Sequence, residues 1–149
     1  MLKAFDRNDF NEYLAMSREF YQSEATDHQV PETHFRDTFE AIVSASPLAR
    51  GWLIIGPDGQ SAGYLLVSLT WSNEFGGKIA WIEELYLKAE TRGQGLGRRV
   101  IEAALAELRE KEKVRGFRLE VAPANESVSL LYQKMGFSPV PYRQWWMAV

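Results

Sequence analysis

The segment of this sequence that most restricts its fold is TRGQGLGRR, residues 91–99, which holds three glycines and three arginines. An apolar strand pattern, WIEELYL at 81–87, precedes it, and an amphipathic helix pattern follows it to about Glu112. The next apolar run, GFRLEVAP at 116–123, is typical of another strand. Because a helix separates the two strands, we expect them to lie side by side and parallel in a right-handed β-α-β crossover. The helix should bury Val100, Ile101, Ala104, Leu105 and Leu108.

The rest of the chain predicts two more helices, a meander of antiparallel strands and a short C-terminal helix. Turns at Pro57-Asp58-Gly59 and in SNEFGGK, residues 72–78, separate three apolar runs, which is typical of strands paired in sequence order. Together with the crossover, this order predicts an α+β fold with a mixed, mostly antiparallel sheet and helices on both faces. The remaining predicted elements are a first strand in MLKAFDR, a helix over 9–21 capped by Asp9, a helix from Pro31 with Phe35, Phe39, Ile42 and Val43 on its buried face, a helix between the cap Asn125 and the stop Gly136, and a final strand, QWWMAV, that closes the sheet.

Composition restricts the classes of function. A chain of 149 residues with 46% hydrophobic residues suits one domain over residues 1–149. The net charge of −3 creates no basic field, so we expect neither nucleic acid nor an anionic membrane as a partner. The lack of cysteine excludes disulfides and a thiolate nucleophile, and two histidines, His28 and His34, are too few to predict a metal site. No apolar stretch has the length of a signal peptide or a membrane span, so we expect a cytoplasmic protein.

A glycine-rich turn between a strand and a helix can hold an anion. The first N–H groups of a helix have no partner within it, and the helix dipole adds partial positive charge there. Glycine permits positive φ and removes the Cβ atoms that keep a phosphate away from these amides. Arg92, Arg98 and Arg99 add cationic donors. No Walker lysine follows, and glycines at 93, 95 and 97 lack the dinucleotide spacing, so a nucleotide triphosphate or NAD is disfavoured. Taken alone, the segment also suits a glycine-bent helix entry on a charged surface.

Residues 92–97, RGQGLG, resemble the Arg/Gln-x-x-Gly-x-Gly/Ala motif of the GNAT superfamily of N-acetyltransferases. WIEELYL resembles the strand before that motif, and RLEVAPANESVSLLYQKMGF, residues 118–137, resembles the superfamily's second sequence block. The similarity covers nearly the whole chain and includes the order of the elements. It implies acetyl-coenzyme A (acetyl-CoA) as the donor, and two parallel strands that splay apart around a bulge to admit the acetyl group.

The resemblance also implies which residues bind acetyl-CoA. Its pyrophosphate would lie on the amides of the glycine segment, and its pantetheine arm would pair with the backbone of the preceding strand. Two further contacts would come from the block downstream, near the pantetheine and the sulfur. The implied coenzyme-binding residues are Leu85, Tyr86, Leu87, Arg92, Gly93, Gln94, Gly95, Leu96, Gly97, Arg98, Asn125 and Tyr132.

Glu83 and Glu84 are the candidate catalytic carboxylates, because two adjacent charges are unusual in an apolar strand. At pH 7 only about one part in a thousand of an alkylamine with a pKa near 10 is neutral, so transfer to an amine needs a general base. Simple alternation places the two side chains on opposite faces of the sheet, unless a bulge intervenes. The resemblance favours Glu83 as the base and Glu84 as the group that anchors or assists. An ion pair or plain solvent exposure is the alternative explanation for each.

Tyr132 is the third candidate catalytic residue. The resemblance places it beside the coenzyme sulfur, where its phenol would protonate the departing thiolate or donate a hydrogen bond to it; packing on an amphipathic helix is the alternative. An amide near Leu85 would polarise the thioester carbonyl. Since the chain has no cysteine and no Ser–His pair to carry an acyl intermediate, transfer would be direct, within a ternary complex.

The acceptor is expected to be a small primary amine, polyamine-like in character. Acidic and aromatic groups together favour a cation, and IEELYL after FGGK resembles the diamine acetyltransferase branch. A protein or peptide amine, and a non-catalytic module that senses acetyl-CoA, are the alternative functions. The tryptophans at 145 and 146 also predict a homodimer surface. The residues expected on the acceptor side are Phe20, Tyr21, Glu24, Asp27, Trp71, Asn73, Glu74 and Phe75.

Overall fold

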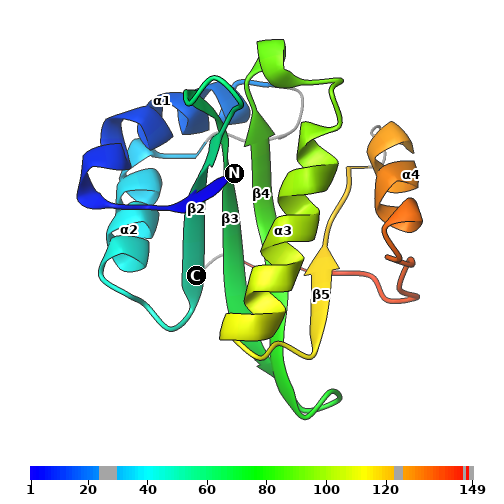
Figure 1. Cartoon of the computed structure of the whole chain (residues 1–149). Coiled ribbons are helices and arrows are strands. Elements are labelled where there is room, and N and C mark those ends of the chain that lie inside the picture. Colours follow the sequence, from blue (N-terminus) through cyan, green and yellow to red (C-terminus); the bar gives the residue numbers. More distant parts are fainter. Residues whose placement is uncertain (24–29, 123–125, 146, 148–149) are drawn as a thin grey trace.

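A computed structural model describes residues 1–23, 30–122, 126–145 and 147. In these residues five strands form one sheet, and their order in space is their order in the chain (Figure 1). The first four strands pair antiparallel, and the fifth runs parallel to the fourth. The predicted mixed sheet is therefore confirmed. The strands are β1 Leu2–Ala4, β2 Ala49–Ile55, β3 Ser61–Ser72, β4 Gly77–Leu87 and β5 Gly116–Leu119.

Tight turns make the central strands pair in sequence order. Gly59, between β2 and β3, has a φ of 80°, and Gly76, just before β4, has a φ of 60°. Glycine adopts this left-handed conformation without the steric cost that a Cβ adds. Both turns lie in the two segments that predicted them, so the meander is confirmed.

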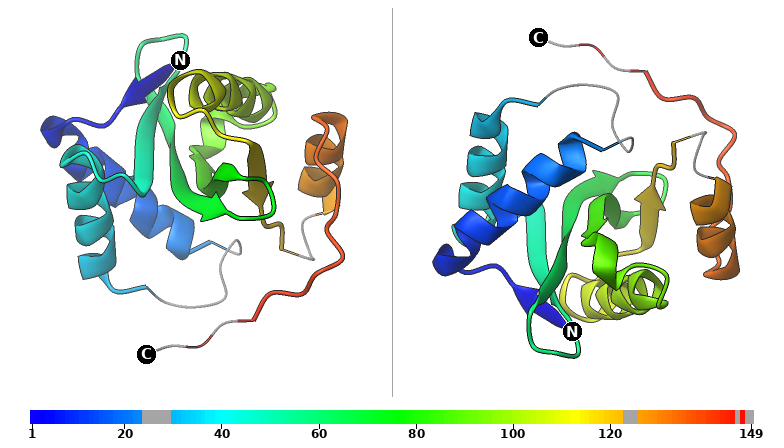
Figure 2. Two further views of the ribbon diagram at one scale, coloured as in Figure 1. Left: turned by 90° about the horizontal axis from the view of Figure 1, so that it is seen from below. Right: turned by 90° about the horizontal axis from the view of Figure 1, so that it is seen from above.

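Helices cover both faces of the sheet, as predicted (Figure 2). The first two helices pack on one face, the third packs on the opposite face, and the fourth lies beyond β5 (Figure 1). Among the described residues, no helix is both long and apolar enough to cross a bilayer. The helices are α1 Phe10–Tyr21, α2 Glu32–Val43, α3 Leu96–Lys111 and α4 Glu126–Lys134, with 3-10 turns η1 Arg7–Asp9 and η2 Ala89–Thr91.

Two apolar clusters show which strand side chains point to which face. Leu65 and Val67 of β3 pack in the cluster under α3, whereas Tyr64 and Leu66 pack in the cluster under α1 and α2. This alternation is the period of two that a strand imposes on its side chains. All five residues predicted on the buried face of α3 are buried in the first cluster, and Phe35 and Phe39 of α2 are buried in the second.

The predicted cap of the first helix is wrong in one respect. Asp9 stands at the N-cap position of α1, but its side chain makes no capping bond there. Its carboxylate instead accepts a bond from the Asp6 backbone N–H at 2.8 Å and from Lys3 Nζ at 2.7 Å. Asp9 is the third residue of the η1 turn, which Asp6 caps in a reciprocal capping box. The capping box therefore turns the Asp9 carboxylate back toward the first strand.

The predicted C-terminal strand is also wrong for the residues that the structure describes. Gln144, Trp145 and Met147 form no strand, and Trp145 is 92% exposed. Pro139 and Pro141 lie between α4 and this segment and have no backbone N–H to donate to a sheet. The described part of the chain after α4 runs along the outside of the fold (Figure 2). The strand predicted over 116–123 is shorter than expected, because β5 ends at Leu119. Asn125, the predicted cap of α4, lies outside the described residues.

Candidate active site

A β-bulge in β4 determines where the two candidate carboxylates point. Leu66 of β3 pairs with Glu84, but the next residue, Val67, pairs with Ile82, so Glu83 is an extra residue in β4. A bulge of this kind breaks the alternation of side chains. Ser68 Oγ donates to Glu83 Oε1 at 2.5 Å, and Glu84 accepts bonds on the α1 and α2 face. The two carboxylates thus share one face, and simple alternation, which placed them on opposite faces, is wrong here.

Glu84 is held by two tyrosine hydroxyls. Tyr21 donates to one carboxylate oxygen and Tyr64 to the other, each at 2.6 Å. Burial raises the pKa of the Glu84 carboxyl, and the two hydroxyl bonds oppose that shift, while the neighbouring Glu83 adds to it. Burial also raises the pKa of both tyrosines, so each remains a hydrogen-bond donor at neutral pH. Glu84 is therefore a fixed, partly buried acid, whereas Glu83 is exposed and has one hydroxyl donor.

Both carboxylates line a cavity of about 380 Å³ between α2 and the sheet. Apolar and aromatic side chains form most of its wall, and the acids stand together on its β4 side. This volume falls in the range of small-molecule sites, and we refer to it as the acceptor cavity. Its lining is Tyr13, Tyr21, Val30, His34, Phe35, Thr38, Ile42, Ala49, Arg50, Leu66, Val67, Ser68, Glu83 and Glu84.

Immediately beyond the carboxylates, β4 and β5 part. Their parallel pairing runs from Ile79 with Gly116 to Ile82 with Leu119 and goes no further. Residues 84–87 of β4 still pair with β3, so only their edge toward β5 is without a strand partner. The splayed parallel pair is confirmed, whereas the pantetheine contact of the Leu85, Tyr86 and Leu87 backbone stays a prediction.

The glycine segment forms a left-handed turn that leads into α3. Gly93 and Gly95 have φ of 74° and 71°, and glycine adopts this left-handed conformation without the steric cost that a Cβ adds. The prediction of positive φ in this segment is therefore confirmed at both positions. Gly95 is the N-cap of α3, and no side chain bonds the amides of the first turn. Gly97 is not among the positive-φ glycines, and a Cβ there would make only an ordinary contact, 3.5 Å from Leu87 Cδ1. The first amides of α3 are thus available to an anion.

The polar side chains around this turn point in different directions. Arg98 Nε donates to Glu102 at 2.8 Å, and the Gln94 amide donates to the Glu90 carbonyl at 3.2 Å. Arg92 Nε donates to the Leu87 carbonyl at 2.8 Å, and its guanidinium lies 5.9 Å from the ring centroid of Tyr86. For the predicted contact between Arg92 and a phosphate, one of two conditions must hold. Either the Arg92 side chain turns toward the amides of the glycine turn, or the phosphate lies at the end of β4, next to the present position of the guanidinium.

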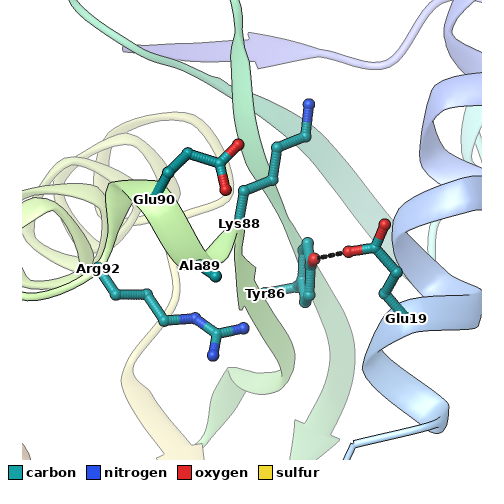
Figure 3. Close-up of a pocket in the computed structure, with 6 residues that line it drawn as sticks. All are labelled: Glu19, Tyr86, Lys88, Ala89, Glu90 and Arg92. Carbon is teal, nitrogen blue, oxygen red and sulfur yellow. Dashed lines mark hydrogen bonds between the residues drawn. The ribbon is translucent and has the colours of Figure 1, made fainter.

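Arg92 also lines a second, open cavity of about 250 Å³ at the end of β4, beside α1 (Figure 3). The Tyr86 hydroxyl donates to Glu19 across it, and burial with this bond raises the pKa of Tyr86 to about 12. Lys88 and Glu90 supply one charge of each sign. Arg92 is the lining residue that belongs to the glycine segment, whereas Lys88 Nζ lies 3.5 Å from Glu12 of α1.

Tyr132 lies in α4 and is buried in the cluster under α3, with Leu85, Leu87 and Leu119 packed against the same cluster. Its ring meets Phe137 edge to face, with centroids 5.6 Å apart. Burial raises the pKa of the phenol, so it is protonated at neutral pH. Tyr132 thus belongs to the apolar cluster against which side chains at the splayed ends of β4 and β5 also pack, while Asn125 lies outside the described residues.

Most of the predicted acceptor residues do not line the acceptor cavity. Tyr21 does, whereas Phe20 packs against the core, and Glu24 and Asp27 lie outside the described residues. Trp71, Asn73, Glu74 and Phe75 lie at the end of the β3–β4 hairpin, where Trp71 and Phe75 are exposed, and they line neither cavity.

Sequence reasoning missed Tyr64 and Ser68, which bond the two carboxylates. Tyr64, Leu66 and Ser68 are spaced two apart in the run YLLVS, and that period places them on one face.

Comparison with known proteins agrees with this geometry. A protein of Bacillus subtilis (strain 168), provisionally named as a ribosomal protein bS18-alanine N-acetyltransferase, is 32% identical over 119 residues, 80% of this chain and 72% of that protein. The thialysine N-epsilon-acetyltransferase of Mus musculus is 24% identical over 154 residues, 95% of this chain and 85% of that protein. The structure of AAC(6')-Iy with the bisubstrate analogue CoA-S-monomethyl-acetylneamine has a TM-score of 0.80 at 14% identity, covering 100% of this chain and 97% of that one.

The fold and these relatives define an acetyl-CoA-dependent N-acetyltransferase. The model of the Acetyltransferase (GNAT) family matches residues 11–137, and the chain belongs to that family.

Proposed function

We propose that the chain transfers an acetyl group from acetyl-CoA directly to a primary amine of a small molecule bound in the acceptor cavity. The observation that carries this proposal is the bulge at Glu83. It brings two carboxylates into one cavity at the residue where β4 separates from β5. An ammonium group attracted there would stand beside the gap that the acetyl thioester needs.

Acetyl-CoA would bind along the end of β4 and the glycine turn. The pyrophosphate would accept bonds from the amides of residues 94–98 at the uncapped start of α3. The pantetheine would lie along the unpaired edge of Leu85 to Leu87, and a backbone N–H near Leu85 would donate to the thioester carbonyl as negative charge develops on its oxygen.

The two carboxylates and Tyr132 would act at different steps of the reaction. The negative charge of the pair draws in the ammonium, and the exposed Glu83 takes a proton from it, directly or through water. The neutral nitrogen then attacks the carbonyl carbon, so that the C–N bond forms and the C–S bond breaks with its electron pair leaving on the thiolate sulfur. The second N–H proton is lost to water, because Glu83 already holds the first. The Tyr132 phenol has an ordinary pKa above that of a thiol, and burial raises it further, so it donates a hydrogen bond to the departing thiolate rather than giving up its proton.

The size of the acceptor cavity favours a small amine over a protein. Its volume of about 380 Å³ is bounded by two helices and three strands, so a folded chain would reach it only by an extended terminus. The Bacillus relative named for ribosomal protein alanine supports that second candidate, an N-terminal alanine of a protein.

Acetyl-CoA-dependent thiol release with a panel of small amines and an alanine-initiated peptide tests this proposal. We expect turnover of small amines, and a loss of about 10²- to 10⁴-fold in kcat for Glu83→Gln, typical of a missing general base. Glu107→Gln, which removes a half-buried carboxylate of α3 that accepts a bond from Lys111 and lines neither cavity, is the matched control and should retain activity. Turnover of the peptide alone would favour the protein acceptor. Acetyl-CoA binding without turnover of any amine would identify a sensor and contradict the proposal.

A further inference from the structure

Among the residues that the structure describes, the acceptor cavity is lined by two carboxylates and by no lysine or arginine side chain that faces it. Arg50 is the one lysine or arginine among its described lining residues. The Arg50 side chain is engaged elsewhere, with Nε 2.7 Å from Glu112 Oε1 and one terminal nitrogen 2.6 Å from the Ser46 carbonyl. Arg50 alternates in phase with Trp52, which packs on the α3 side, and Glu112 stands at the C-terminus of α3. Arg50 therefore lines the cavity with its backbone and directs its charge to the opposite face of the sheet.

Residues 24–29, between Tyr21 and Val30, lie outside the described residues and read EATDHQ. They include two acids and no lysine or arginine. His34, on α2, is the other side chain with a ring or guanidinium nitrogen among the described lining residues. The described lining residues thus offer no lysine or arginine side chain that faces the cavity and could pair with a carboxylate of the acceptor.

From this charge distribution we infer that the acceptor is an amine with no carboxylate on the carbon that bears it, the class of amine that decarboxylation of an amino acid produces. This inference rests on the proposed function. A carboxylate in that position lies within a few ångströms of the nitrogen, and so beside Glu83 and Glu84 when the nitrogen is placed for attack. Two like charges about 5 Å apart at an effective dielectric constant of about 20 change an equilibrium by roughly 100-fold.

The wall of the cavity favours an apolar or aromatic body on this amine. Val30, Phe35 and Ile42 lie on its helix side, and Tyr21 adds an aromatic ring to the lining. An arylalkylamine thus fits both the acidic end and the apolar wall. The reaction that supplies such a substrate is the loss of CO₂ from an aromatic amino acid, which removes the group that the cavity repels.

Acceptors that differ only in the group beside the amine separate the effect of the carboxylate's charge from the effect of its size. We would measure kcat/KM at pH 8 for phenethylamine, phenylalanine amide and phenylalanine, because the amide keeps a substituent of similar size without the charge. We expect phenylalanine to be at least about 100-fold poorer than its amide, and the amide to stay within about tenfold of phenethylamine. Phenylalanine used as well as its amide would overturn the inference and leave the proposed function intact. No thiol release with any amine would refute both.

A substitution in the cavity tests whether the charge of Glu84 causes this discrimination against the carboxylate-bearing acceptor. In Glu84→Gln the ratio of kcat/KM for the amide to that for the acid should fall at least about tenfold, since one of the two repelling charges is gone while the hydroxyl partners remain. The ratio cancels any general loss of activity. Glu107→Gln on α3 should leave the ratio unchanged. An equal ratio in the wild type and Glu84→Gln would show that the carboxylates are not the source of the discrimination.

Discussion

Two glycine-to-alanine substitutions at the start of α3, one at Gly95 and one at Gly97, should have opposite effects on the free energy of unfolding. Gly95 has a φ of 71°, and a Cβ added there would lie no closer than 3.7 Å to Arg99, so crowding costs nothing. The left-handed conformation alone costs an alanine about 1–2 kcal/mol. The smaller freedom of the unfolded chain offsets about 0.4–1 kcal/mol of this. Gly95→Ala should therefore lower the free energy of unfolding by about 0.5–1 kcal/mol.

Gly97→Ala is the matched control, because Gly97 lies inside α3. Its added Cβ would make ordinary contacts with Leu87 Cδ1 at 3.5 Å and Leu85 Cδ2 at 3.8 Å. Alanine stabilises a helix interior by up to about 1 kcal/mol relative to glycine, so this variant should be more stable than the wild type. The motif that the segment resembles also accepts alanine at this position.

Urea denaturation at pH 7 measures both free energies of unfolding, and calorimetric titration measures acetyl-CoA affinity. We expect Gly95→Ala to bind acetyl-CoA at least about tenfold more weakly, a change of about 1.4 kcal/mol, because the strained turn displaces the amides that it presents. Gly97→Ala should bind within about threefold of the wild type, or about 0.7 kcal/mol. Equal losses of affinity in the two variants, or a stable Gly95→Ala that binds normally, would refute the role assigned to the turn.

Four further predictions follow from the same contacts. Glu84→Gln should lower kcat/KM for amines yet raise the free energy of unfolding at pH 8, because burial raises the pKa of this carboxyl in the folded protein. The wild type should regain stability relative to the variant as pH falls through that raised pKa, and urea denaturation at several pH values measures this. Tyr132→Phe should lower kcat and leave the acetyl-CoA dissociation constant unchanged, as single-turnover kinetics and titration would reveal. Ile101→Ala, at a fully buried position of α3, should cost about 2–5 kcal/mol in urea denaturation. Glu112→Gln should destabilise at neutral pH, since the bonds from Lys78 and Arg50 outweigh burial and lower the pKa of Glu112; the difference should vanish as pH falls through that lowered pKa.

Local sequence patterns predicted most of the fold because local physics determines those parts. The turns at Gly59 and Gly76, the buried face of α3 and the left-handed glycines before it each depend on a few adjacent residues. The parallel pairing of β4 and β5 follows from the helix between them.

Features that depend on pairing between distant residues were not predictable in this way. The bulge at Glu83 is set by the register between β3 and β4, and alternation along one strand cannot reveal it. The orientation of Asp9 depends on Lys3 and on the capping box of the preceding turn. The run QWWMAV has the composition of a strand, but among the described residues its Gln144 and Trp145 have no strand beside them, and the homodimer surface inferred from its tryptophans stays a prediction.

Amide hydrogen exchange with and without acetyl-CoA tests the central claim most directly. The account predicts that acetyl-CoA slows exchange in peptides covering residues 85–87 and 94–98 and leaves α2 unaffected, because the coenzyme would take up the unpaired edge of β4 and the uncapped amides of α3. ATP and NAD at the same concentration should protect neither peptide. Protection confined to other segments, or equal protection by ATP, would contradict the assignment of the glycine turn as the acetyl-CoA site.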